Sequence, residues 1–324
     1  MSNYPCQGLS IVICTWNRAE SLRATLLSLS AQEAVAEHPL EVVVVDNNSS
    51  DHTKAVVDEW KARWTLGALR YVFEPCQGKQ FALNRGIAHS THDVLAFTDD
   101  DIAFEPTWTR EILRIFSDSA LELAGGKTLI LWPDSGRPNW YHSSMSAIFG
   151  GVDLGDERLL PAPPEYAPAG ANLVGRRSLF ERIGNFSEKH FRHMDHEFGM
   201  RSQRMGAVIS YEPSLLVYAP VDIDCLTKRY FQKWSFKAGI AREENPSESD
   251  VGFFGIPKWV YRRAFEDFFH LLLHQQSDPA HRFVRELRLW RSMGRISRGW
   301  HERFFPSRHS EWVKKHSQKN KNVY

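Results

Sequence analysis

The sequence predicts an α/β fold, with a mainly parallel sheet that has helices on both faces, followed by a helical C-terminal extension. Two observations predict it. Four short apolar runs, at 9–14, 42–45, 69–73 and 94–97, alternate with segments of helical spacing, and this alternation gives parallel strands joined by helices. The last hundred residues are basic and have helical spacing throughout. A chain of 324 residues has room for one large domain and a sizeable appendage.

The spacing of apolar residues defines the elements of the first half. Leu9–Cys14 is a first buried strand, and a helix begins near Ala19. Leu22, Leu26 and Leu29 fall on one face of that helix. The elements that follow are a strand at 41–46, a helix at 55–64, a strand at 69–73, a helix from 79 to about 88 and a strand at 94–97.

The last of these strands leads directly into three carboxylates, Asp99, Asp100 and Asp101. A buried strand explains the apolar run before them, but adjacent like charges cost stability at the end of a core strand. Carboxylate oxygens are the ligands that Mg²⁺ and Mn²⁺ prefer, and open α/β sheets bind ligands at the carboxyl ends of their strands. A metal site is therefore one interpretation. The alternative is an acidic loop or a cluster stabilised by a helix dipole.

Composition and charge exclude several classes of protein. Hydrophobic residues make up 42% and charged residues 24%, as in an ordinary globular protein. There is no apolar run of 18 residues, and residues 1–5 have no signal-peptide pattern. The four cysteines are widely spaced, as expected in a reduced cytosolic protein. We therefore expect a cytoplasmic location. A peripheral location on the inner face of the membrane is the alternative.

The net charge of +1 conceals an asymmetry between the two parts of the chain. From Cys225 onward there are 20 basic and 10 acidic residues, which leaves 20 basic and 29 acidic residues before it. The two parts are thus expected to face different partners. No DNA- or RNA-binding motif accompanies the basic part, so nucleic acid is not an expected partner.

Polar residues follow each predicted strand, at 15–18, 46–48, 78–79 and 99–101. In a doubly wound sheet these loops lie together at one edge. Asp46 can accept hydrogen bonds from a base or a ribose, and Arg18 and Lys79 can neutralise phosphates. The pattern indicates a nucleotide-diphosphate site, although neither a Walker motif nor GxGxxG is present.

Over residues 8–222 the sequence resembles the inverting family 2 glycosyltransferases, which have the Rossmann-like GT-A fold. The resemblance is carried by motifs in the order of the family: Ser10–Arg18, Glu41–Asp51, Gly78–Ile87, Thr98–Asp101 at the DxD position, Gly170–Arg177 with Ile183–Phe186, and His193–Arg201. It implies a GT-A domain at 1–224, with a nucleotide-binding half at about 8–102 and an acceptor half at about 103–224. Residues 225–324 form the basic helical extension.

The resemblance also implies partners and residue roles. The donor is a nucleotide sugar, most often a UDP-sugar, used with Mn²⁺ or Mg²⁺, and the acceptor is a saccharide, a lipid-linked group or a peptide. Asp195 matches the general base, and Asp101 and Asp99 match the metal position, which Asp100 can share. The residues implied for nucleotide-sugar binding are Thr15, Trp16, Asn17, Arg18, Asp46, Asn48, Gly78, Lys79, Asn84, Asp99 and Asp100. Those implied on the acceptor or sugar side are Asn172, His193 and Glu197.

The chain departs from the family pattern in two places. Met194 stands where the family often has Glu, and 217–221 lack the usual histidine. The first change weakens the positioning of the acceptor or the base, and the second removes a contact to metal or phosphate, but neither removes the core machinery. His190, His193 and His196 offer a zinc site as an alternative, but their spacing drifts around a helix.

Two further regions leave alternatives open. Trp132, Trp140, Tyr141 and Tyr166 either stack on a sugar or cover the sheet. In the extension, Phe265, Phe268, Phe269 and Leu272 form an apolar helix face, and Arg288, Arg291, Arg295 and Arg298 form a basic stripe. That stripe is expected at a membrane, with Trp290 and Trp300 at the interface, or in solvent, or against the acidic part of the chain.

Two other functions compete with glycosyl transfer. A nucleotidyltransferase that makes sugar nucleotides would need a glycine-rich basic loop after the first strand, which 15–18 lack. A non-catalytic carbohydrate- or nucleotide-binding protein on the same fold would not need both the Asp99–Asp101 run and Asp195.

Overall fold

The computed structural model describes residues 8–33, 38–189, 193–241, 252–273 and 278–317. The chain divides into two compact units. The sheet unit comprises residues 1–131 and 150–220, and the helical unit comprises 132–149 and 221–324. Residues 132–149, which the sequence analysis counted with the first domain, thus pack in the helical unit.

The sheet unit contains an eight-stranded sheet with the order β3-β2-β1-β4-β7-β6-β8-β5. Strands β1 to β4 are parallel to one another, and β7 runs antiparallel to both β4 and β6. The predicted mainly parallel sheet is confirmed. The strands are β1 Leu9–Thr15, β2 Leu40–Asp46, β3 Ala68–Phe73, β4 Val94–Asp99, β5 Ala103–Phe104, β6 Leu123–Leu131, β7 Leu173–Arg176 and β8 Ile209–Pro220.

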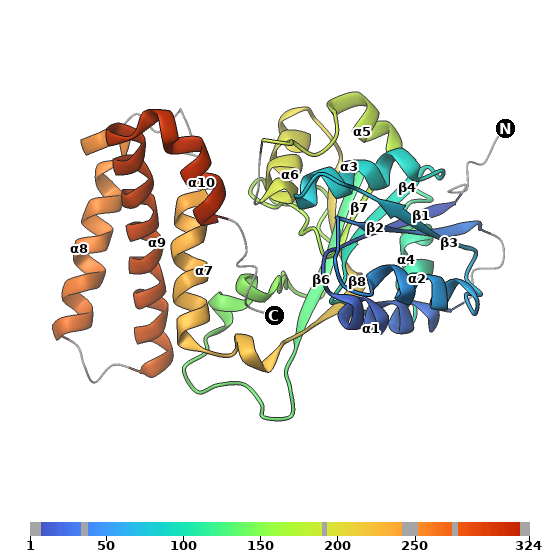
Figure 1. Ribbon diagram of the computed structural model, residues 1–324, viewed down its shortest axis with the longest axis horizontal. Coiled ribbons are helices and arrows are strands. Elements are labelled where there is room, and N and C mark those ends of the chain that lie inside the picture. The colour runs from blue at the N-terminus through green and yellow to red at the C-terminus, as the bar shows by residue number, and fades with distance from the viewer. Residues whose placement is uncertain (1–7, 34–37, 190–192, 242–251, 274–277, 318–324) are drawn as a thin grey trace. The chain divides into compact units, whose positions relative to one another are not determined.

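Helices cover both faces of this sheet, as Figure 1 shows. One face carries α1 (Ala19–Ser30), α2 (Thr53–Lys61) and α4 (Trp108–Ile115). The other face carries α3 (Lys79–His89), α5 (Arg177–Ile183) and α6 (Met194–Arg204).

Alternation along the strands divides the apolar core between these two faces. In β1, Ile11 and Ile13 pack toward α1 and α2, whereas Val12 and Cys14 pack toward α3. Because both faces are buried, the strand reads as a continuous apolar run rather than an alternating one. The same alternation sets the face of the sheet toward which the last residue of each strand points.

The helical unit consists of α7 (Lys228–Ala241), α8 (Lys258–Leu273), α9 (Pro279–Phe304) and α10 (His309–Ser317), with short 3₁₀ turns at 143–149, 223–225, 253–255 and 306–308. Helix α9 packs against both α7 and α8. Close approach of α7 and α9 requires glycine: a Cβ on Gly239 would lie 2.1 Å from the Arg291 carbonyl oxygen, and one on Gly294 would lie 2.1 Å from that of Phe236. In the part of the chain described, no helix is both long and apolar enough to cross a membrane.

The loop aromatics pack against one another and on helices. The Trp140 ring lies 5.1 Å from the rings of both Phe231 and Phe283, and Trp132 lies 4.6 Å from Tyr141. All these residues belong to the helical unit. These aromatic residues therefore pack within the helical unit, whereas Tyr166 is buried in the core of the sheet unit with its ring 5.8 Å from that of Tyr211.

Arginines of the α9 basic stripe contact other residues of the helical unit. Arg288 is bonded to Asp267, Arg295 is buried with its guanidinium 4.9 Å from the Trp259 ring, and Arg298 donates to the Ile240 carbonyl oxygen at 3.1 Å. The apolar face of α8 is instead exposed. Contacts within the helical unit were not among the alternatives that the sequence offered for this stripe.

Candidate active site

The loops that follow the parallel strands meet at one edge of the sheet. Thr15, the last residue of β1, is in register with Asp46, the last residue of β2. On its other side β1 is in register with β4, which places Cys14 beside Asp99. Four polar segments far apart in the sequence are therefore neighbours.

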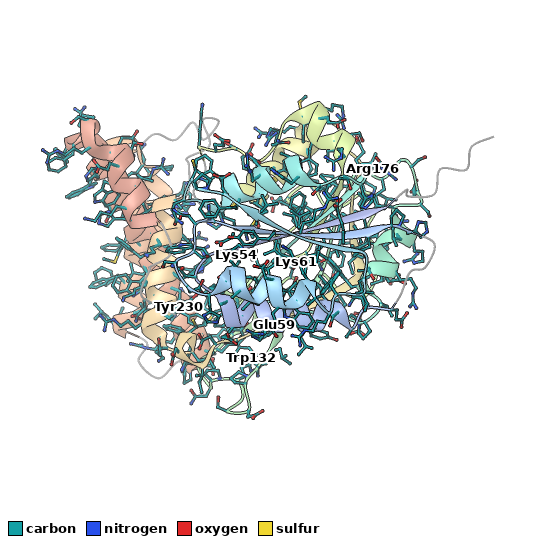
Figure 2. All side chains as sticks on the ribbon, turned by 45° about the vertical axis from the view of Figure 1, so that its right-hand side comes forward. Lys54, Glu59, Lys61, Trp132, Arg176 and Tyr230 are labelled. Atoms are coloured by element: carbon teal, nitrogen blue, oxygen red, sulfur yellow. The ribbon has the colours of Figure 1, made fainter. Side chains whose placement is uncertain are left out.

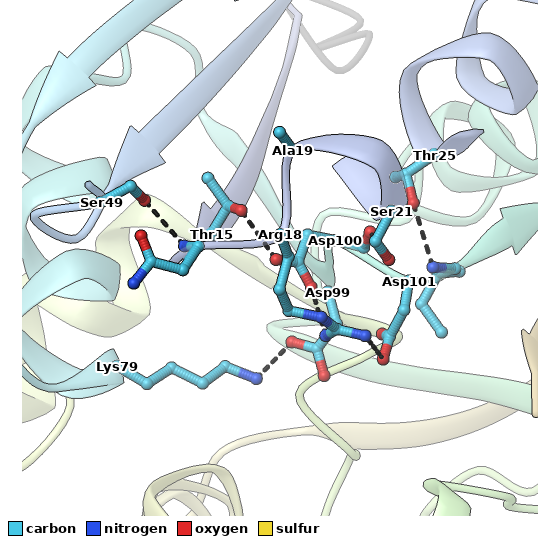
Figure 3. Close-up of polar contacts among 12 residues, drawn as sticks. Thr15, Arg18, Ala19, Ser21, Thr25, Ser49, Lys79, Asp99, Asp100 and Asp101 are labelled. Carbon is cyan, nitrogen blue, oxygen red and sulfur yellow. Dashed lines mark hydrogen bonds and ion pairs between the residues drawn. The ribbon is translucent and has the colours of Figure 1, made fainter. Parts of the chain in front are cut away.

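The three consecutive carboxylates take different partners: Asp99 is the last residue of β4, and Asp100 and Asp101 lie in the turn that follows it. Asp99 forms an ion pair with Lys79. The Asp100 carboxylate accepts from Thr15 Oγ1 at 2.7 Å and from Arg18 Nη1 at 2.6 Å. Arg18 Nη2 also donates to Asp101 at 2.9 Å (Figure 3).

Asp100 is the buried member of the run, with 4% of its surface exposed. Desolvation raises the pKa of Asp100 to about 6, although the Arg18 guanidinium acts in the opposite direction. Both of its oxygens are engaged by protein donors. We interpret Asp100 as the anchor that holds the loop after β4 to the start of α1.

Asp99 and Asp101 keep 29% and 34% of their side-chain surfaces exposed. Their carboxylates suit a hard divalent cation, and Mg²⁺ is usually held by one or two carboxylates together with substrate phosphates and water. Among the described residues, no three His, Cys, Asp or Glu side chains form a complete metal cage. The donor set thus fits an ion that a diphosphate would help to hold.

Asp46 is fixed from two sides. Its Oδ1 accepts from the Ser49 backbone N–H at 2.8 Å, and its Oδ2 accepts from the Tyr71 hydroxyl at 2.7 Å. Burial and the Asp46 carboxylate raise the pKa of Tyr71. Lys54 and Lys61 of α2, both labelled in Figure 2, lie 5.6 and 5.9 Å from the Tyr71 ring. The carboxylate is therefore held in a defined orientation at the end of β2.

Two asparagines adopt left-handed backbone conformations in the loops of this edge. Asn17 has φ 52° and Asn48 has φ 65°, a region that asparagine tolerates better than most residues. The Asn17 side-chain oxygen accepts from Ser50 N at 2.6 Å, which ties the β1–α1 loop to the β2–α2 turn. Trp16 beside it is half-buried.

Asn47 organises the next loop, and sequence reasoning assigned it no role. Its side-chain oxygen accepts from the Gly78 N–H at 2.8 Å, and its amide donates to the Cys76 carbonyl oxygen at 2.6 Å. Gly78 has φ 148°, and a Cβ there would lie 2.8 Å from the Gln80 amide. In the sequence, the only indication of a role for Asn47 is its position directly after Asp46, at the end of a strand.

Asp195 lies in the first turn of α6 and accepts from the Gly170 backbone N–H at 2.7 Å. Desolvation lowers the pKa of Lys79, but the charges of Asp99 and Asp195 outweigh it and raise that pKa above its ordinary value. Lys79 is therefore ion-paired with Asp99 and lies within electrostatic range of Asp195, although almost a hundred residues separate the two aspartates in the sequence. His193, with φ 57°, precedes the helix and is exposed.

Three of the predicted site residues, one from the nucleotide side and two from the acceptor side, make contacts within the fold. Both atoms of the Asn84 amide are bonded to the backbone of Phe186, at 3.0 and 3.1 Å. Asn172 is buried and bonded to Trp108, Lys127 and Leu215. Glu197 pairs with Arg201 at 2.8 Å. Of the three histidines considered for zinc, His190 lies outside the described residues, and His193 and His196 are exposed.

The fold and this polar edge define a protein of the GT-A class. The family model described as "Glycosyl transferase family 2" matches residues 10–184, more than half of the chain. The chain belongs to this family.

Several named proteins are similar to it. Glycosyltransferase AglE of Haloferax volcanii is 30% identical over 179 residues, which are 55% of each chain. Pre-mycofactocin glycosyltransferase of Mycobacterium tuberculosis is 28% identical over 215 residues, 65% of this chain and 42% of the relative. Succinoglycan biosynthesis protein ExoM of Rhizobium meliloti is 26% identical over 239 residues, 71% and 72% of the two. The chain spans about half the length of the first two relatives.

Solved structures share the fold. Mannosyltransferase PcManGT from Pyrobaculum calidifontis, in complex with GDP-Man and Mn²⁺, has a TM-score of 0.50 and 17% identity, covering 95% of this chain and 84% of its own. Residues 1–349 of S. aureus TarS give a TM-score of 0.51 and 16% identity, covering 90% and 92%. At this level of identity the likeness supports the fold alone.

Proposed function

We propose that this chain is a metal-dependent, inverting glycosyltransferase that moves a sugar from a nucleotide sugar to a hydroxyl acceptor. The observation that carries the proposal is the polar edge at the ends of β1, β2 and β4, where Asp99 forms an ion pair with Lys79 and Asp46 is held by Tyr71 and Ser49. Donor and acceptor chemistry need two carboxylate centres on either side of the transferred sugar. Lys79 is ion-paired with Asp99, the first of these carboxylates, and the charge of Asp195, the second, acts to raise its pKa.

The donor side uses the edge formed by β1, β2 and β4. Arg18 and Lys79 neutralise the diphosphate, and Asp46, held by Tyr71 and Ser49, accepts from the base or the ribose. PcManGT was solved with GDP-Man, and TarS 1–349 was also solved with UDP-GlcNAc. We propose the same class of donor here, with a UDP-sugar as the first choice.

Asp101 and Asp99 hold Mn²⁺ or Mg²⁺ in this proposal. When bound, the ion stabilises the negative charge that grows on the departing diphosphate. Asp100 is held by Thr15 and Arg18. It keeps the loop in place, and its two neighbours, which are more exposed and are ion-paired with Lys79 and Arg18, are the carboxylates proposed to hold the ion.

Asp195 is the general base. The hydrogen bond from Gly170 N–H fixes one of its oxygens. As the acceptor hydroxyl oxygen forms a bond to the anomeric carbon, its proton passes to the Asp195 carboxylate, and the bond from that carbon to the diphosphate oxygen breaks. Attack from the face opposite the leaving group inverts the anomeric centre.

The acceptor side is proposed in class only. A hydroxyl on a saccharide, on a lipid-linked group or on a peptide satisfies the chemistry, and two exposed histidines, His193 and His196, flank Asp195 in the sequence. We propose action at the cytoplasmic side of the cell.

A donor screen tests the function. UDP- and GDP-sugars are incubated with the full chain and Mn²⁺, Mg²⁺ or EDTA, and both nucleoside-diphosphate release and melting temperature are measured. We expect one donor to raise the melting temperature by several degrees, about 4 °C near saturation, and to be hydrolysed slowly in the presence of the metal. The proposal is overturned if no donor raises the melting temperature and none is hydrolysed. Release of pyrophosphate from a nucleoside triphosphate and a sugar 1-phosphate would instead favour a nucleotidyltransferase.

A further inference from the structure

Helix α8 buries a charge and exposes its aromatic residues, the reverse of an ordinary surface helix. Asp267 is 1% exposed and Val260 is fully buried. On the opposite side, Phe265 is 64% exposed and Leu273 is 74% exposed. A contiguous group of large apolar side chains on a surface indicates an interaction site, whereas single exposed apolar residues do not.

The rotational setting of α8 is fixed from inside the helical unit. Asp267 accepts from Arg288 and from Arg285 Nη1, the latter at 3.3 Å, and both arginines belong to α9. Turning the helix to bury its phenyl rings would leave this carboxylate and its arginines without their partners, which is costly for a buried ion pair. The exposure of the apolar side is therefore a consequence of specific contacts.

The exposed apolar side is continuous. At about 100° per residue, Phe265, Phe268, Phe269, Leu272 and Leu273 occupy a sector of about 140°, and their exposed fractions range from 40% to 74%. We call these five residues the α8 apolar face. Phe253, 75% exposed, extends it at the start of the helix, where its ring lies 6.5 Å from that of Tyr261.

The charges around this face are mostly positive. Lys258, Arg262 and Arg263 occupy the first two turns of α8 and are exposed. The helix has two acids: Asp267 is buried, and Glu266 is paired with Arg262 at 3.4 Å. The apolar face itself carries no acid. Phenylalanine and leucine on one side, with basic residues beside them, is the composition of helices that lie in a lipid interface.

We infer that the α8 apolar face binds the surface of an anionic lipid bilayer. The helix lies along the interface, its phenyl and leucyl side chains enter the boundary between headgroups and acyl chains, and Lys258, Arg262 and Arg263 contact anionic headgroups. This face differs from the α9 arginine stripe, most of which is engaged inside the unit. The inference concerns the helical unit and does not rest on the activity proposed above.

Co-sedimentation of the full chain with vesicles tests it. Vesicles of phosphatidylcholine with phosphatidylglycerol are compared with vesicles of phosphatidylcholine alone. We expect the wild-type chain to pellet with the anionic vesicles, and Phe265→Glu with Phe269→Glu to weaken this binding by about tenfold or more. Arg262→Glu with Arg263→Glu should weaken binding to anionic vesicles and leave any binding to neutral vesicles unchanged. Leu27→Glu, at a position of α1 that is 62% exposed, is the matched control and should bind like the wild type.

Three outcomes would overturn the inference. The first is a wild-type chain that stays in the supernatant with both kinds of vesicle. The second is a phenylalanine double variant that binds as well as the wild type. The third is that the wild-type chain is a dimer in sedimentation velocity, that the phenylalanine double variant is a monomer, and that neither binds vesicles. This result would assign the face to a second copy of the chain. Donor hydrolysis without vesicles, measured on each variant, reports separately on the sheet unit.

Discussion

Lys79, the first residue of α3, forms an ion pair with Asp99, the last residue of β4. The contact joins the start of a helix to the end of a strand, at the edge where the loops gather. The charge of Asp195, in the first turn of α6, also acts to raise the pKa of the same lysine. Lys79 is thus the side chain through which the metal end and the base end of the proposed site are related.

Replacement of this lysine should weaken donor binding. We expect Lys79→Met to raise the dissociation constant for UDP by about 10- to 100-fold, because a charged hydrogen bond to phosphate is lost. Calorimetry with UDP and Mn²⁺ measures it. Arg114→Met removes an exposed arginine of α4 that is paired with Glu111. It is the control and should leave the dissociation constant for UDP unchanged. Equal affinities in the Lys79 variant and the wild type would remove Lys79 from the donor site.

The different burial of the neighbouring carboxylates predicts different outcomes for their replacement. Asp100→Asn should lower the free energy of unfolding by about 2–4 kcal/mol, because it leaves the partly buried Arg18 without its main counter-charge. Asp101→Asn should keep the wild-type stability and lose the increase in melting temperature that Mn²⁺ with UDP produces. Thermal unfolding with and without these ligands measures both. The assignment of the ion to Asp101 fails if that variant responds fully while Asp100→Asn is stable and unresponsive.

A buried glutamate in β2 should make the stability depend on pH. Burial raises the pKa of Glu41, but hydrogen bonds from Ser10 at 2.7 Å and from Thr91 at 2.8 Å, together with Arg70, hold it below its usual value. A carboxyl whose pKa is lower in the folded state stabilises the fold above its unfolded pKa, and this stabilisation is lost as the pH falls from about 5 to 3.

The variant Glu41→Gln measures this contribution. We expect it to be less stable than the wild type at pH 7 in urea unfolding, with a difference that shrinks toward pH 3. A difference of the same size at both pH values would show that the glutamate acts through shape or hydrogen bonding rather than charge.

Helix α3 approaches the sheet closely enough to require a glycine. A Cβ on Gly86 would lie 2.3 Å from Val12 Cγ1, and Val12 is a buried β-branched residue with little freedom to move. Gly86→Ala should therefore destabilise the fold by about 1–3 kcal/mol despite the better helix propensity of alanine. Urea unfolding measures it, and Arg85→Ala, at an exposed position of the same helix, should be nearly neutral. Stabilisation by Gly86→Ala would show that α3 can shift away from β1.

Local patterns were sufficient to predict the parallel part of the sheet. Runs such as 94–97 are apolar on both faces, and polar residues follow each strand end, so the strands and the edge with Thr15, Asp46 and Asp99 could be inferred. The antiparallel position of β7 between β4 and β6 could not, because strand order depends on contacts distant in sequence.

Side-chain partners were harder to predict than positions. Asn84 and Asn172 lie in family-like motifs, yet the structure uses their amides to hold backbone groups of distant segments. In the helical unit, apolar spacing located the α8 face, but spacing does not say which side is buried. The decision came from Asp267, whose partners are on α9.

The central claim, that Asp195 is the base of a glycosyl transfer, is tested most directly by Asp195→Asn. The variant and the wild type are compared for turnover of the donor found in the screen and for UDP binding by calorimetry. We predict that turnover falls by about 10²- to 10⁴-fold while the dissociation constant for UDP with Mn²⁺ stays within about twofold. Turnover close to that of the wild type, or loss of UDP binding, would contradict the claim.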